Sequence, residues 1–182
     1  KNYIENIPIL NKVKLFNSNE INCSTIFLFT LPIDNKIHNK VCLDWICNDL
    51  NDKFFNFIRV KHNLGYIAQI ELYEMNDLFI IIAETIHHKS NSEKVLKLMN
   101  NFFINIEISE NGNQHNIIEY KSIINSYIHN YYYKLNKHQE NISTNILKEY
   151  IKSSNKLTKR EVLIVLKKML KNKKTIIISN ND

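Results

Sequence analysis

The scarcity of chain breakers is the feature that most restricts the fold of this chain. Its 182 residues include only two glycines and two prolines. Glycine and proline supply most tight turns and helix ends, so a chain with so few of them suits long helices and argues against a loop-rich or all-β fold. The length fits one domain, and we expect residues 1–182 to form a single domain.

Apolar periodicity predicts both strands and helices. Runs that are apolar, β-branched or alternating predict strands at about 13–15, 23–31, 66–74, 78–86 and 174–179. Apolar residues at three- to five-residue spacing predict helices over about 37–62, 91–104, 117–137, 140–152 and 158–170. The resulting order, β-β-α-β-β-α-α-α-α-β, predicts an α+β fold: a mixed, mainly antiparallel sheet with several helices packed on one side.

Two local signals refine this prediction. Asn76 and Asp77 form a turn signal, which predicts that the strands 66–74 and 78–86 make a hairpin. The second of these strands is continuously apolar, so we expect it to be central and buried on both faces. Thr158 followed three positions later by Glu161 is a capping box, which predicts a helix start at this point.

The charge balance bears on possible partners. The formal net charge is +6, and a basic domain can attract nucleic acid or acidic peptides. The chain has only two arginines, Arg59 and Arg160, and no dense basic stripe interleaved with aromatics. Because arginine is the preferred reader of phosphates and base edges, we do not expect nucleic-acid binding. A basic nucleic-acid-binding module stays as the alternative from another class, and steep salt dependence would reveal it.

Cysteine usage and hydropathy bear on the compartment. Cys23, Cys42 and Cys47 show neither C-x-x-C nor zinc-ribbon spacing, so we expect free thiols that are mostly buried. Free thiols slightly favour a reducing, cytoplasmic location, although the compartment is otherwise open. No apolar run approaches the roughly 20 residues that span a bilayer, so no membrane partner is expected. The chain begins with Lys1, and we expect it to be a piece of a longer protein.

Seven histidines invite a search for metal ligands. Neither H-x-x-E-H nor H-E-x-x-H occurs. Glu84, His87 and His88 form E-x-x-H-H, but they fall at a strand end rather than on a helix, where i, i+4 spacing makes two ligands converge. We therefore expect no metal site and no catalytic residue in this chain.

The most informative segment is FIRVKHNLGYI, residues 57–67. It resembles a stretch of the insulin-degrading-enzyme (pitrilysin) family of zinc metallopeptidases, in which a long helix ends in an arginine and a Leu-Gly-Tyr sequence leads into the central hairpin. Here Arg59 precedes Tyr66 by seven positions. The order of elements across nearly the whole chain, including the LTKRE start of the last helix at 157–161, is also similar to that family.

This resemblance implies a fold position and a function. The chain looks like the fourth, C-terminal and non-catalytic domain of such a peptidase, in which zinc is bound by an N-terminal domain outside this sequence. It implies that the parent hydrolyses peptides, that this domain forms part of the substrate chamber beside the other domains of the same chain, and that Arg59 and Tyr66 position the peptide. Donors such as a guanidinium and a phenol are suited to orienting a peptide carbonyl.

A second interpretation within the same superfamily is a structural or processing-peptidase-like subunit without activity of its own. The retained Arg59 and Tyr66 pair argues against it. The presence or absence of H-x-x-E-H in a preceding domain would separate the two interpretations.

Overall fold

The computed structural model describes residues 12–14, 21–34, 36–106 and 144–179. The chain divides into two compact units. The first contains Lys1–Pro32, Cys47–Ile106 and Lys168–Asp182, and the second contains Ile33–Ile46 and Glu107–Lys167. The predicted helix at 117–137 lies outside the described residues, as do residues 140–143 of the next one.

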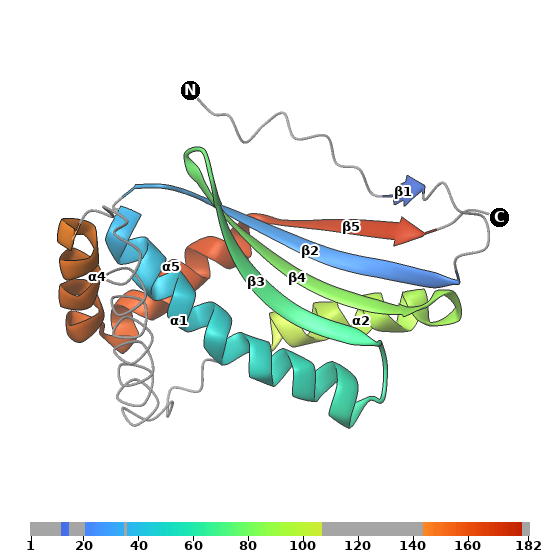
Figure 1. The fold of residues 1–182 in the computed structure, drawn as a ribbon. Helices are drawn as coiled ribbons and strands as arrows, with labels where there is room; N and C mark the ends of the chain where they lie inside the picture. Colours follow the sequence, from blue (N-terminus) through green and yellow to red (C-terminus); the bar gives the residue numbers. More distant parts are fainter. Residues whose placement is uncertain (1–11, 15–20, 35, 107–143, 180–182) are drawn as a thin grey trace, which may run out of the picture. The chain divides into compact units, whose positions relative to one another are not determined.

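The first unit is built on a five-stranded sheet in the order β1-β5-β2-β4-β3 (Figure 1). The strands are β1 (Lys12–Lys14), β2 (Asn22–Pro32), β3 (Ile67–Met75), β4 (Leu78–His88) and β5 (Lys173–Ser179). β1 pairs with β5 in parallel, and all other pairs are antiparallel. The predicted mixed, mainly antiparallel sheet is therefore confirmed, with all five strands close to their predicted positions.

The hairpin of β3 and β4 is also confirmed. Asn76 adopts the left-handed backbone conformation, with φ of 53°, at the turn between the strands. β4 lies between β2 and β3, so its central position is as predicted. Burial on both faces is wrong: Phe79, Ile81 and Ala83 are buried, but the alternate residues stay half-exposed. The apolar run is continuous because isoleucine also occupies the side of the strand that is only half covered.

The two faces of the sheet differ in their cover. The inner face carries Phe27 and Phe29 of β2, whose rings lie 5.6 Å and 5.0 Å from the ring of Phe103. Phe103 belongs to α2 (Ser92–Ile104), which packs against β2 and β4 (Figure 1). Phe54, near the end of α1 (Lys36–Phe55), joins the same cluster. In this unit, helices therefore cover one side of the sheet, as the α+β prediction requires.

The predicted long helix is divided in two. α1 is followed by a short π-helical segment, η2 (Asn56–Lys61), so the helical region ends within one residue of the predicted position. π-helical turns are rare and often found at functional sites. This one contains Arg59.

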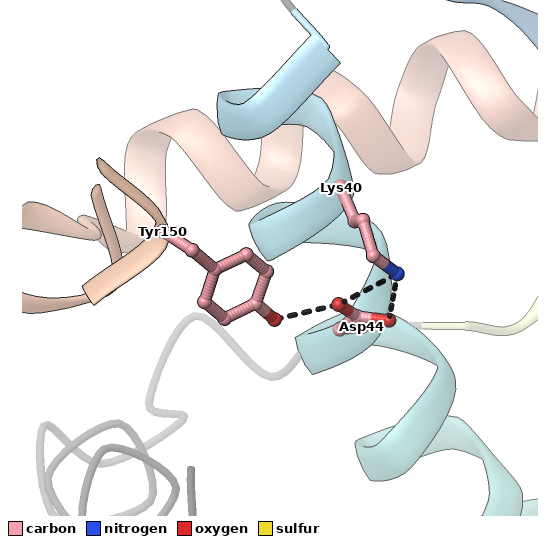
Figure 2. Close-up of polar contacts among 3 residues, drawn as sticks. All are labelled: Lys40, Asp44 and Tyr150. Carbon is pink, nitrogen blue, oxygen red and sulfur yellow. Dashed lines mark hydrogen bonds and ion pairs between the residues drawn. The ribbon is translucent and has the colours of Figure 1, made fainter. Parts of the chain in front are cut away.

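The second unit contains the N-terminal half of α1, α4 (Thr144–Lys156) and most of α5 (Lys159–Lys171). The Tyr150 hydroxyl of α4 donates a hydrogen bond of 2.6 Å to Asp44 of α1, and Lys40 pairs with the same carboxylate at 3.3 Å (Figure 2). A hydrogen bond to a charged, partly buried acceptor is stronger than one between neutral groups. This contact joins two segments separated by about a hundred residues of sequence.

The capping box that opens α5 is confirmed. Glu161 accepts hydrogen bonds from the backbone N–H and the hydroxyl of Thr158, at 2.9 Å and 2.6 Å. In return, the backbone N–H of Glu161 points to the Thr158 hydroxyl at 3.4 Å. The bond from the Thr158 side chain lowers the pKa of Glu161, because it stabilises the carboxylate form.

Candidate functional site

The connection between η2 and β3 places the two residues singled out by the sequence. It is compact: the N–H of Leu64 donates to the carbonyl of Ile58 at 3.1 Å, and Asn63 has φ of 50°. Tyr66 then joins the sheet, because its N–H donates to the carbonyl of Ile86 on β4 at 2.6 Å. The chain reverses between a helix end and a strand start with little freedom in between.

Gly65 is required at this reversal for two reasons. Its φ of 74° lies in the left-handed region that side chains disfavour. A Cβ atom at this position would also lie 2.8 Å from the Thr85 methyl carbon and 3.1 Å from the Ile86 carbonyl oxygen. The backbone can approach β4 this closely only as glycine, and this approach positions the next residue, Tyr66.

Arg59 and Tyr66 are brought together through a backbone contact. The Arg59 guanidinium donates a hydrogen bond to the Tyr66 carbonyl oxygen and lies over the ring of Phe55, 5.8 Å from its centroid. The Tyr66 side chain is 57% exposed, and no described residue bonds its hydroxyl. The connection thus presents an exposed Tyr66 and an Arg59 guanidinium that still has donors to offer, since arginine carries five.

Glu84, His87 and His88 do not converge. Glu84 and His87 lie on opposite faces of β4, since their positions differ by three. His87 is fully buried, with Nε2 2.9 Å from the Thr25 hydroxyl and Nδ1 3.0 Å from the His88 carbonyl oxygen. Burial lowers the pKa of His87, because a charged imidazolium loses its hydration. Within the described ranges, no group of His, Cys, Asp and Glu side chains has the arrangement of a metal site.

The three cysteines are buried thiols outside any disulfide, as predicted. Cys42 lies 3.7 Å from Nε2 of His38, an arrangement that superficially suggests a nucleophile and its base. Burial, assisted by the negative charge of Glu161, raises the pKa of Cys42 to about 12. The thiol therefore stays protonated near neutral pH and is a poor nucleophile.

Sequence reasoning missed the polar groups on the outer face of the sheet, defined here as the face opposite Phe27 and Phe29. Glu84 and Glu71 lie on it, one on β4 and one on β3, in neighbouring cross-strand rows. Glu84 accepts hydrogen bonds from Ser24 of β2 at 2.6 Å and from Gln69 of β3 at 3.4 Å. The signal in the sequence was Glu84, the one charged residue within the mainly apolar stretch 78–86.

No described helix is long and apolar enough to cross a membrane.

Comparison with known proteins identifies the fold. No protein-family model matches the sequence, and no curated protein matches it significantly. Among solved structures, the inactive peptidase domain of a protein assigned as a zinc protease from Bordetella parapertussis matches with a TM-score of 0.71 and 11% identity, covering 92% of this chain and 98% of that one. The peptidase M16 inactive domain from Pseudomonas fluorescens matches with a TM-score of 0.64 and 16% identity, covering 94% and 43%. The chain has the fold of a peptidase M16 domain.

The periplasmic protease PqqL from Escherichia coli shows how such a domain occurs within a larger protein. It matches with a TM-score of 0.70 and 13% identity over 93% of this chain, but this chain spans only 20% of the PqqL chain. The M16 domain fold agrees with the family resemblance carried by residues 57–67. Two of the solved domains of this fold are described as inactive.

Proposed function

We propose that this chain is a non-catalytic domain of a larger zinc metallopeptidase, and that it forms part of the chamber in which the parent enzyme holds its peptide substrate. The M16 domain fold supports this, as does the match to 20% of one protease and to 98% of one inactive peptidase domain. In this proposal residues 1–182 work beside other domains of the same parent chain. One of those domains supplies the zinc ion, which activates water for hydrolysis.

The observation that carries the proposal is the exposed Tyr66, whose backbone carbonyl is held by the Arg59 guanidinium. A phenol that only packed against the sheet would be covered, but the Tyr66 side chain is 57% exposed. Gly65 and the Arg59 guanidinium both serve to place it, one through the backbone and one through the Tyr66 carbonyl. Two separate contacts therefore fix the backbone of Tyr66, as expected for a residue whose position is important for function.

The chemistry available to this pair is the donation of hydrogen bonds to a peptide. The Tyr66 hydroxyl and the remaining Arg59 N–H groups are donors, and a peptide backbone presents a carbonyl acceptor at every residue. Donors directed at the carbonyl under attack stabilise the negative charge that develops there. Because these donors belong to a domain without the metal, cleavage would depend on how the parent closes around its substrate.

The test is peptide hydrolysis by the parent protein, with and without a chelator, in wild type and in the variants Arg59→Ala and Tyr66→Phe. We expect chelator-sensitive cleavage whose kcat/KM falls about tenfold to a thousandfold in each variant, the range for one lost transition-state donor. Arg160→Ala is the control, because Arg160 is the other arginine and lies exposed on α5. Thermal melting of each variant excludes general unfolding.

Two outcomes would contradict the proposal in different ways. Chelator-sensitive cleavage that neither variant affects would leave Arg59 and Tyr66 as structural residues. A parent that cleaves no peptide would instead favour the structural or processing-peptidase-like subunit, which pairs with an active partner.

A further inference from the structure

The outer face of the sheet combines apolar and acidic groups in an unusual way. Register places Ile26 of β2 and Gln69 of β3 on either side of Glu84, and Ile82 and Ile86 precede and follow it on the same face of β4. All of these residues are half-exposed. Glu84 is therefore a carboxylate set into a largely isoleucine surface that solvent can still reach.

The Glu84 carboxylate is oriented but not neutralised. Ser24 donates to one of its oxygens and Gln69 to the other, and both donors are uncharged. Among the described residues, no lysine, arginine or histidine forms an ion pair with it. A carboxylate has about four acceptor sites, so it can accept further hydrogen bonds. The fixed orientation leaves these sites available to a donor that approaches from solvent.

A second carboxylate reinforces this charge. Glu71 pairs across the strands with Ile82, one row away from Glu84, and accepts a hydrogen bond from the exposed Tyr73 hydroxyl. That hydrogen bond raises the pKa of Tyr73, and the charges of Glu71 and Glu84 both add to the effect. Both carboxylates thus act on the same part of the outer face.

The free edge of β3 is less suited to an added strand. The outward-pointing N–H of Ile70 already donates to the Asn51 side chain of α1 at 2.8 Å. A partner is therefore expected on the outer face, where apolar and acidic groups meet, rather than paired along this edge.

We propose that the outer face of β2, β4 and β3 binds peptide segments in which a lysine or arginine is flanked by apolar residues. The cation is placed between Glu84 and Glu71, and the flanking side chains cover Ile26, Ile82 and Ile86. The attraction between the peptide cation and the two glutamates is local. The chain as a whole has a net charge of +6, which would repel a basic peptide. This inference rests on the proposed peptide-chamber function and names the class of substrate segment that the domain prefers.

The test is binding of labelled peptides to the full chain, measured by fluorescence anisotropy. One capped peptide has a central lysine between leucines and valines with serines at its ends, and its partner has norleucine in place of lysine. We expect the lysine peptide to bind about five- to thirtyfold more tightly, a ratio between those of exposed and fully desolvated charge pairs. We also expect this preference to shrink as salt increases.

Isosteric variants locate the preference. Glu84→Gln and Glu71→Gln should each reduce it, and the double variant should abolish it. Glu74→Gln is the matched control, because Glu74 lies exposed on β3 but on the opposite side of the strand from Glu71. Circular dichroism and melting temperature establish that each variant is folded, since glutamine retains the size of glutamate.

Several results would overturn this inference. They are equal binding of the two peptides, no binding of either, or a lysine preference that survives in the double variant. A concentration-dependent dimer that blocks peptide binding would assign the outer face to a second copy of the chain. The chamber proposal is judged separately: if Arg59→Ala impairs cleavage by the parent but Glu84→Gln leaves its peptide preference unchanged, only the present inference fails.

Discussion

Replacing Gly65 with alanine should destabilise the chain strongly, although it adds only one methyl group. Two costs combine. An alanine at φ of 74° lies in the left-handed region, at about 1–2 kcal/mol. Its Cβ would also lie 2.8 Å from the Thr85 methyl, and Thr85 is fully buried on β4 and cannot move aside freely. Relief of such an overpacked contact costs about 1–3 kcal/mol.

The expected loss is therefore about 2–5 kcal/mol in the free energy of unfolding, measured by urea denaturation of the full chain. For a chain of this size, each kcal/mol corresponds to a change of about 2–4 °C in Tm. Asn63→Ala is the matched control, because Asn63 lies in the same connection with φ of 50° and is exposed. Asn63→Ala should lower the free energy of unfolding only by the cost of an alanine in the left-handed conformation, about 1 kcal/mol.

The difference between the two variants isolates the steric contact with β4. If Gly65→Ala costs no more than Asn63→Ala, the close approach of the backbone to Thr85 is not what makes glycine necessary. In that case, contact with β4 at Gly65 is not what positions Tyr66 against the sheet. Loss of stability should also be accompanied by loss of peptide cleavage in the parent protein, if the proposed function holds.

Three further predictions concern stability and reactivity. Tyr150→Phe should lower the free energy of unfolding by about 1–2 kcal/mol, because it removes a hydrogen bond to a charged acceptor. The loss should be smaller in an Asp44→Ala background, which has no acceptor at this position, and an undiminished loss there would contradict the assignment. The pKa of His87 is lower in the folded chain than in the unfolded chain, where it is about 6.5. Its contribution to the free energy of unfolding is therefore fully present above pH 6.5. Below pH 6.5 this contribution should fall, by up to about 1.4 kcal/mol per pH unit. His87→Gln should flatten urea-derived stability between pH 6.5 and 5, and an unchanged slope would exclude His87 as the cause. Cys42 should resist iodoacetamide at pH 7.5 in the folded chain, and rapid labelling without unfolding would contradict its raised pKa.

Local patterns in the sequence determined most of the elements. Some features depend only on contacts within a few residues: the capping box of Thr158 and Glu161, the Asn76 turn and the alternation of the strands. They can therefore be predicted from the sequence without the tertiary structure. The spacing of Arg59 and Tyr66 was also visible, because a helix end and a strand start are themselves local. What stays a prediction for this pair is its contact with a substrate.

Tertiary structure alone decided which distant residues meet. Ser24 reaches Glu84 only because β2 pairs with β4 in one particular register, across sixty positions of sequence. The same pairing leaves one face of β4 half-exposed, although its continuous apolar run predicted burial on both sides. The periodicity of a helix or strand is a local property of the sequence. The register of strand pairing and the burial of each sheet face depend on segments far along the chain. The sequence therefore determined the elements and the Arg59–Tyr66 spacing, and the fold decided that Glu71 and Glu84 share an apolar face.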